Sequence, residues 1–258
     1  MVKSSMDGRA IEIMGGFAKG LSVIEAFGQG YERLTISEAS RLTGLDRATA
    51  RRCLLTLTEG GYAAFDGKFF VLTPRVLRLG YAYLSSTSLP RQLQPFLEQL
   101  SEATQESSSA AILDGAEIIY IARAAQRRVM SIGLNIGSRL PAYCASMGRV
   151  LLAALPENEM MDVLRRSNLQ ALTPKTLTDI RALAEEIGRV REQDYALIDQ
   201  ELELGLRSIA VPIRDSAGKT VAAVNTGVHV ARASTERMVD EFLPRLLDLQ
   251  KMLEKILR

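Results

Sequence analysis

The 258-residue sequence contains no tryptophan, one histidine, two cysteines and no long hydrophobic run. Two cysteines, Cys53 and Cys144, cannot build a disulfide framework. With His229 as the single histidine, a structural zinc site is not expected either, and we predict no metal and no cofactor. No apolar run approaches the roughly 18 residues that a membrane helix needs, and no apolar segment follows the charged start. We therefore expect a cytoplasmic protein without membrane contact.

Length and charge distribution favour two domains with different partners. A chain of 258 residues exceeds the usual size of one compact domain. The net charge is only +2, yet residues 33–78 hold eight Lys or Arg against four acidic residues. A cationic segment beside a near-neutral remainder predicts one module for a polyanion and one for another ligand.

Residues 17–61 carry the signals of three short helices. The first places four large apolar residues at helical spacing: Phe17, Leu21, Ile24 and Phe27. We expect Ser37 to cap the start of the second helix, Gly44 to end it, and Asp46 to cap the third. Two helices joined by a short glycine-containing turn form a helix-turn-helix. After Gly61, two strand-like runs around Asp66-Gly67, a dipeptide typical of type I′ turns, predict a hairpin and hence a winged helix-turn-helix.

The third helix is expected to enter the major groove of double-stranded DNA, as the second helix of such a motif does. Its expected inward face is Ala50, Cys53, Leu54 and Leu57. Arginine can grip a guanine or a phosphate, and threonine can contact a thymine methyl or a phosphate. We assign DNA contact to Ser37, Arg47, Thr49, Arg51 and Arg52, with Lys68 near the wing tip. Which of the three arginines reads bases stays open, and the helix by itself would equally suit a solvated surface.

The remaining chain predicts a linker helix at 74–89, between a DNA-binding domain at 1–73 and an effector domain at 90–258. Strands are expected at 107–113, 117–123, 129–134, 207–213 and 220–228, and helices at 144–155, 177–193 and 235–257. Adjacent strands linked by tight turns imply an antiparallel sheet with helices on its faces, an α+β fold.

The stretch RLPAYCASMGRVLLA, residues 139–153, predicts an anion site. An extended segment enters a helix near Tyr143 to Ser146, where free N–H groups and the helix dipole favour a negative charge. Ser146 offers a hydroxyl, Tyr143 and Met147 can flank an aromatic body, and Arg139 is the expected counter-charge. These features suit a small carboxylate in a mostly apolar pocket, although an ordinary core helix explains the stretch equally well.

Catalysis is the weaker alternative. A small-acid-metabolising enzyme with an accessory nucleic-acid module would have to use Cys144, with His229 as base, but no orienting group or oxyanion hole can be identified. GGFAKG and GQGYER lack the spacing and the preceding strand of a dinucleotide site. Asp199, Glu201 and Glu203 alternate and indicate a polar loop or a strand edge. An architectural DNA binder would leave about two thirds of the chain without a task.

Three segments together resemble the IclR family of bacterial transcriptional regulators: TISEASRLTGLDRATARRCLLTLTEGGY with the hairpin after it, GSRLPAYCASMGRVLLA, and ELELGLRSIAVPIRDSAGKTVAAVNTGV. The likeness covers nearly the whole chain in the right order. The middle segment is most similar to the branch that controls aromatic-acid breakdown through protocatechuate and the β-ketoadipate pathway.

The resemblance implies a GAF-like effector domain, a linker helix used in dimerisation, and a homodimer or dimer of dimers on a palindromic operator. It implies no catalytic residue. The implied pocket lining is Val129, Ile132, Leu140, Ser146, Met147, Leu206, Ser208, Asn225 and Gly227. Some relatives have cysteine at Ser208 and serines at Asn225 and Gly227, which disfavours a glyoxylate-like ligand and favours a larger ring acid. We expect a sequence-specific regulator modulated by an aromatic acid or a β-ketoadipate-type metabolite.

Overall fold

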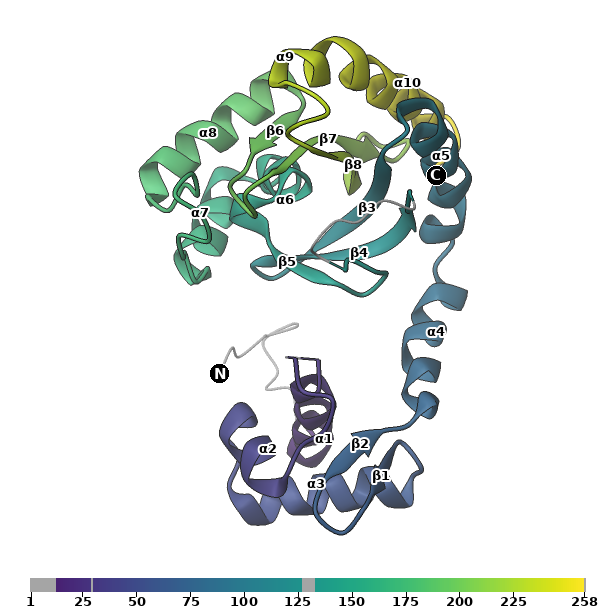
Figure 1. The fold of residues 1–258 in the computed structure, drawn as a ribbon, viewed down its shortest axis with the longest axis vertical. Helices are drawn as coiled ribbons and strands as arrows, with labels where there is room; N and C mark the ends of the chain where they lie inside the picture. Colours follow the sequence, from purple (N-terminus) through teal and green to yellow (C-terminus); the bar gives the residue numbers. More distant parts are fainter. Residues whose placement is uncertain (1–12, 29, 127–132, 258) are drawn as a thin grey trace. The chain divides into compact units, whose positions relative to one another are not determined.

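The chain divides into two compact units, Met1–Tyr83 and Leu84–Arg258, each with its own apolar core (Figure 1). The computed structural model describes residues 13–28, 30–126 and 133–257. Within these ranges no helix combines the length and the apolar character that crossing a membrane requires.

The first unit is a winged helix-turn-helix, as the sequence predicts. Its elements are α1 (Gly15–Ala26), α2 (Ile36–Thr43), α3 (Arg47–Glu59), β1 (Ala63–Phe65) and β2 (Phe70–Leu72). Val23, Leu34, Leu54 and Phe70 are each at most 1% exposed and form the centre of its core. Leu34, just before α2, pairs its backbone with Phe70 of β2, which joins the wing to the helices.

The cap of α2 is Thr35, so the expectation that Ser37 caps this helix is wrong. The Thr35 hydroxyl accepts the N–H of Glu38 at 3.3 Å, and the Glu38 carboxylate accepts the N–H of Thr35 at 2.7 Å. This reciprocal capping box satisfies two donors at once, which a cap at Ser37 cannot do. The hydrogen bond from the Thr35 backbone also lowers the pKa of Glu38. The cap at Asp46 and the left-handed Gly44 (φ 69°) are confirmed.

The buried side of α1 differs from the expected one. Val23 and Ala26 face the core together with Phe27, whereas Phe17 is 65% exposed and Leu21 is 39% exposed. The helix is apolar around most of its circumference, so helical spacing alone does not select the face that packs against α3.

The wing turn lies one residue later than the predicted type I′ centre. Phe65 pairs with Phe70, and the N–H of Asp66 bonds the carbonyl of Phe69, which leaves Gly67 and Lys68 at the centre. The Asp66 carboxylate accepts the N–H groups of Lys68 and Phe69 at 2.8 and 2.7 Å and thereby fixes this register. Gly67 takes a φ of 102°, and Lys68 stands exposed at the tip.

The linker begins with a 3-10 turn (Pro74–Val76) and continues as α4 (Leu77–Ser86), followed by α5 (Leu89–Thr104). No residue of α4 is buried, and Leu77 and Tyr81 are 71% and 70% exposed. An amphipathic helix normally buries its apolar side, so α4 lacks a cover within the described residues.

The second unit is built on a six-stranded antiparallel sheet in the order β5-β4-β3-β8-β7-β6. Its strands are β3 (Ser107–Asp114), β4 (Glu117–Ala124), β5 (Arg139–Pro141), β6 (Ala196–Asp199), β7 (Leu206–Arg214) and β8 (Thr220–His229). The two predicted strand pairs are confirmed, and β5 and β6 were not predicted. Of the strand expected at 129–134, residues 129–132 lie outside the described residues, and Gly133 and Leu134 are not in a strand.

Helices cover both faces of this sheet. They are α6 (Ser146–Ala153) after a 3-10 turn (Ala142–Cys144), α7 (Glu157–Arg166), α8 (Ile180–Gln193), α9 (Thr235–Arg237), a π-helical turn (Met238–Phe242) and α10 (Leu243–Glu254). One core lies between the sheet and α6 to α8, and the other lies between the sheet, α5 and α10 (Figure 1). The α+β prediction is confirmed; α7 was not predicted.

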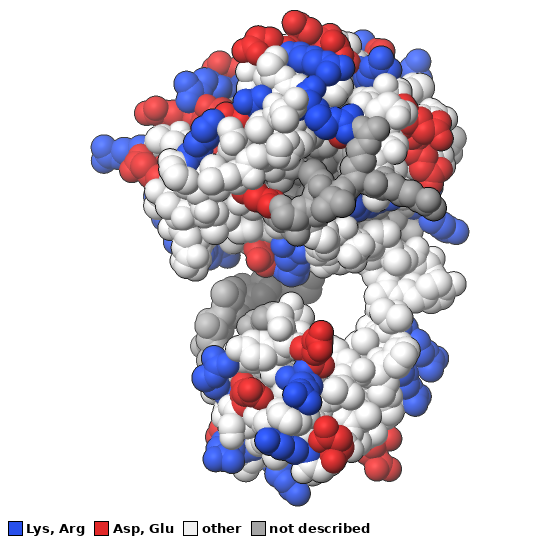
Figure 2. All heavy atoms as spheres, viewed as in Figure 1, with Lys and Arg blue, Asp and Glu red and all other residues white. Residues whose placement is uncertain are grey.

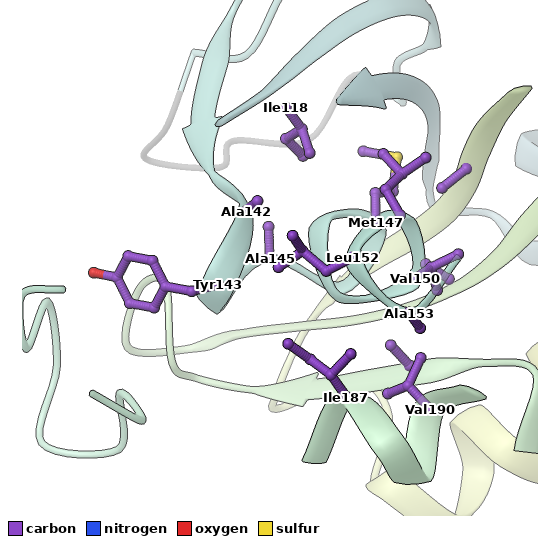
Figure 3. Packing of buried hydrophobic residues seen from close by; sticks show 14 of the residues in the cluster. Ile118, Ala142, Tyr143, Ala145, Met147, Val150, Leu152, Ala153, Ile187 and Val190 are labelled. Carbon is purple, nitrogen blue, oxygen red and sulfur yellow. The ribbon is translucent and has the colours of Figure 1, made fainter. Parts of the chain in front are cut away.

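All residues of α6 are buried, because the helix lies close to the sheet. The sheet presents small side chains to it: Ala111, Ala196, Ala210 and Ala223. A Cβ atom on Gly148 would lie 2.1 Å from the carbonyl oxygen of Ala142, so only glycine allows the preceding turn to fold against the helix. On the outer side, α8 packs Ile187 and Val190 below α6 (Figure 3).

Gly148→Ala should therefore destabilise the protein by about 3 kcal/mol, since helix and backbone must move apart. Gly188→Ala in α8 is the matched control: nothing lies within 4 Å of its added Cβ, and helix propensity predicts a gain of up to about 1 kcal/mol. Urea unfolding of both variants measures the difference, and equal midpoints would contradict the proposed close packing.

Candidate effector cavity and DNA-contact helix

The α6 N-terminus and the sheet line a cavity that is partly open to solvent. Its lining is Ser107, Ser109, Tyr120, Arg123, Leu134, Leu140, Cys144, Ala145, Ser146, Met147, Ile198, Leu202, Leu206, Ser208, Asn225 and Gly227. Apolar surface with a few polar groups is typical of a small-molecule site.

Strand register arranges the floor of the cavity in two rows. One row consists of Arg123, Ser109 and Asn225, which are cross-strand neighbours on β4, β3 and β8. The second row runs through Ser107, Gly227, Ser208 and Ile198 on β3, β8, β7 and β6. Because alternate residues of a strand share a face, both rows point to the α6 side.

A β-bulge places Tyr120 and Arg123, three residues apart, on this same face. Ala110 pairs with Ala122, but Ala111 pairs with Tyr120, so Ile121 is the extra residue. Ile121 and Ala122 both pack into the opposite core. Burial raises the pKa of Tyr120 to about 12, so its hydroxyl stays protonated at neutral pH. Period-two alternation alone would not bring Arg123 and Tyr120 together.

The N-terminal end of α6 has a serine hydroxyl without a hydrogen-bond partner among the described residues and no capping side chain. Ser146 is 1% exposed, and its Oγ has no hydrogen-bond partner within the described ranges. Ala145 stands at the cap position and has no side chain that can accept from the first turn. Because the first N–H groups of a helix have no acceptor inside it, this end can bind a polar or anionic group.

Seven of the residues assigned to the ligand from the sequence meet in this cavity: Leu140, Ser146, Met147, Leu206, Ser208, Asn225 and Gly227. Val129 and Ile132 lie outside the described residues. The strands and α6 thus bring together positions that are up to 87 residues apart in the chain, from 140 to 227.

Arg139 does not supply a counter-charge to this cavity. Its guanidinium forms ion pairs with Asp114 and Glu117, both at 2.7 Å, at an exposed edge of the sheet. Neighbouring residues on a strand point to opposite faces, so Leu140 points inward and Arg139 points outward. The expectation for Arg139 is wrong.

Tyr143 is also placed differently from the expectation. Its hydroxyl donates to the carbonyl of Gln170 at 2.7 Å and accepts the N–H of Gln170 at 3.1 Å. Figure 3 shows the ring pointing away from Met147 and the other labelled residues of α6. Tyr143 therefore anchors the loop after α7 and does not flank a ligand in the cavity.

A buried ion pair, missed at the sequence level, fixes α6 to the loop after β6. Arg149 is 2% exposed, donates to the carbonyl of Tyr143 at 2.9 Å and pairs with Glu201 at 2.6 Å. The Glu201 carboxylate also accepts the N–H of Leu177 at 3.0 Å. This loop carries Leu202 to the cavity wall.

Cys144 is unsuited to nucleophilic chemistry. It is fully buried, and burial raises the pKa of its thiol to about 12. His229 lies exposed at the end of β8, where its Nδ1 accepts the N–H of Ala231 at 3.2 Å. In the part of the chain that the structure describes, no group of three His, Cys, Asp or Glu residues could hold a metal ion.

Helix α3 exposes Arg47, Arg51 and Arg52, and Figure 2 shows Lys and Arg side chains interspersed with Asp and Glu on the visible face of the first unit. Thr49 was expected to be outside the inward face, but it is 7% exposed, and its hydroxyl accepts from Arg52 at 3.4 Å. The Asp46 carboxylate caps α3 by accepting the Thr49 N–H at 2.9 Å.

Comparison with known proteins agrees with this architecture. Residues 17–67 match the IclR helix-turn-helix domain, and residues 81–254 match the C-terminal domain of the bacterial transcriptional regulator IclR. The chain belongs to the IclR family. It is a DNA-binding transcriptional regulator of the type that includes the Pca regulon regulatory protein of Pseudomonas putida, which is 47% identical over 92% of this chain and 81% of that protein.

Solved structures of IclR-family proteins extend the likeness to three dimensions. A putative transcriptional regulator from Rhodococcus sp. RHA1 superposes with a TM-score of 0.80, at 49% identity over 95% of this chain and 98% of that one. The inducer-binding domain of an Acinetobacter PobR double mutant, solved with 3-hydroxybenzoic acid, gives a TM-score of 0.62 at 34% identity, over 65% of this chain and 98% of that one.

Thiol labelling tests the assignment of Cys144. At pH 8 a thiol with a pKa of about 12 is almost entirely protonated, so native protein should react with one equivalent of reagent, at the partly buried Cys53. Cys53→Ser should then abolish native labelling, whereas Cys144→Ser should leave it unchanged. Labelling of Cys144 in folded protein would contradict its burial.

Proposed function

We propose that this regulator binds a small aromatic carboxylate in the α6 cavity and that occupancy of the cavity changes its binding to operator DNA. The observation that carries the proposal is the unpartnered Ser146 hydroxyl at the uncapped start of α6, aimed into a mostly apolar cavity. A ligand can shift the protein between a state that binds the operator and a state that binds it more weakly only if its affinity differs between these two states.

Two further observations support an aromatic acid. The cavity combines apolar residues, such as Met147 and Leu206, with the polar row Arg123, Ser109 and Asn225. A benzene ring with polar substituents matches such a lining better than glyoxylate, which has no apolar part. The PobR domain of known structure holds a hydroxybenzoic acid, and a Pca regulator is among the relatives. A β-ketoadipate-type metabolite is the second candidate.

We infer that α3 reads the operator through Arg47, Arg51 and Arg52, with Ser37 and Lys68 in contact with phosphates. Thr49 contributes through its bond with Arg52. A recognition helix reads bases with the residues of its N-terminal part, which is where Arg47 and Arg51 lie.

We further propose a homodimer, alone or as a dimer of dimers, on a palindromic operator in the cytoplasm. Support comes from α4, whose apolar side chains are exposed, and from α1, which exposes Phe17 and Leu21. Half-sites should lie about one helical turn of DNA, roughly 34 Å, or a multiple of it apart. The domain boundaries that we propose are 1–73, 74–89 and 90–258. No enzymatic step is proposed, since Cys144 is buried and protonated.

Thermal-shift titration tests the effector. We expect 4-hydroxybenzoate or protocatechuate to raise the melting temperature in a saturable way, because a ligand that binds only folded protein stabilises it. Glyoxylate and β-ketoadipate serve as the competing ligands. Absence of a shift with any aromatic acid, in protein that still binds DNA, would contradict the proposed effector class.

Operator binding tests the DNA-contact helix. Arg47→Ala and Arg52→Ala should each weaken specific binding by about 1–3 kcal/mol, since a bidentate base contact is worth that much, and leave effector affinity unchanged. Arg165→Ala in α7, an exposed arginine paired with Asp162, removes the same charge from the other unit and should change neither. Fluorescence anisotropy at fixed salt gives the affinities. Wild-type affinity for both α3 variants would reject the assignment.

A further inference from the structure

We propose that Arg123 receives the carboxylate of the effector and thereby gives the cavity its preference for an acid over a neutral ring. This inference rests on the proposed function. It assigns the negative end of the ligand to the sheet, and not to Arg139 or the start of α6.

The first support is the position of Arg123. It lies on the cavity floor, in the row that contains Ser109 and Asn225, and the bulge at Ile121 turns it to the same face as Tyr120. Its Nη1 donates to the Ser109 hydroxyl at 3.1 Å. A guanidinium has five N–H donors in a planar fork, so this bond leaves a pair free for the two oxygens of a carboxylate.

The second support is that the described residues supply no carboxylate partner to Arg123. Three other arginines of this unit, none of them fully exposed, have carboxylate partners: Arg149 with Glu201, Arg207 with Asp199 and Arg214 with Asp194. None of the ion pairs within the described residues involves Arg123, and among those residues the hydroxyl of Tyr120 is the one titratable group that influences its charge. A partly buried cation without a partner is costly in an apolar surrounding, and an anionic ligand would remove that cost.

The third support comes from the polar side chains that lie beside Arg123 on the neighbouring strands. Ser109 is 2% exposed and Asn225 is 8% exposed, so neither is freely solvated. Together with Arg123 they form a strip of side-chain donors across three strands. By contrast, the start of α6 offers Ser146 and neutral N–H groups, which suit a ring hydroxyl.

Isothermal titration of the full-length protein with 4-hydroxybenzoate and 4-hydroxybenzamide tests this assignment, because the two compounds have the same shape and differ in charge. Wild type should prefer the acid by about 10- to 100-fold, the range for a charged hydrogen-bonded pair. In Arg123→Gln this preference should fall to near one, with amide affinity kept within about threefold, and Arg123→Lys should lie between. The control Arg139→Gln should keep the wild-type preference.

The outcomes distinguish a failure of the Arg123 assignment from a failure of the aromatic-effector proposal on which it rests. An Arg123→Gln protein that retains the acid preference would overturn the assignment and place the carboxylate elsewhere in the cavity. Equal loss of acid and amide would overturn it too, because Arg123 would then only shape the cavity. Wild type that binds neither compound, nor protocatechuate and its amide, would reject the aromatic effector itself and this inference with it. Because an unpaired charge is removed, Arg123→Gln should melt no lower than wild type without ligand.

Discussion

The cavity depends on how closely α6 lies to the backbone that precedes it. Gly148 faces the Ala142 carbonyl at a distance that leaves no space for a side chain, and a layer of alanines on the sheet allows the whole helix to be buried. A buried helix that begins at Ser146, with Ala145 at the cap position, has no capping side chain to accept from its first N–H groups. Tight packing of one helix therefore also creates the polar end of the site.

Two buried or partly buried arginines of the second unit lie at the cavity beside α6 or on α6 itself. Arg149 and Glu201 neutralise each other inside the protein and hold α6 against the loop after β6, which brings Leu202 to the cavity. Arg123 stands on the other side of the cavity without such a partner among the described residues. Arg149 is thus used to hold the structure together, whereas Arg123 remains available to a ligand. The two arginines differ because the fold brings a carboxylate close to Arg149.

The sequence was sufficient for elements whose signals are local. The Asp46 cap, the glycine turn at Gly44 and the alternating strand pairs reflect the chemistry of neighbouring residues, and they are confirmed. The face of α1 and the cap at Thr35 could not be chosen from spacing alone, because two alternatives differ by a few residues. The local pattern of residues 139–153 indicated Ser146 and Met147, and family likeness added five cavity positions that no local pattern unites with them: Leu140, Leu206, Ser208, Asn225 and Gly227.

Long-range contacts explain what the sequence did not reveal. Arg139 stands beside a segment that enters α6, but its carboxylate partners come from the β3–β4 turn. Regular alternation along β4 predicts that Arg123 points to the face opposite Tyr120. The extra residue at Ile121 reverses this and turns Arg123 to the same face. Glu201 belongs to a polar loop, as expected, although its partner Arg149 lies 52 residues earlier.

The exposed linker α4 has a thermodynamic consequence. A helix of ten residues is at the limit of stability in water, and none of the residues of this one is buried against the part of the chain that the structure describes. Any surface that covers its apolar residues also supplies the free energy that keeps it helical. If α4 pairs with a second copy of the chain, as proposed above, folding of the linker and association through it form one equilibrium, and the stiffness of the linker then depends on protein concentration.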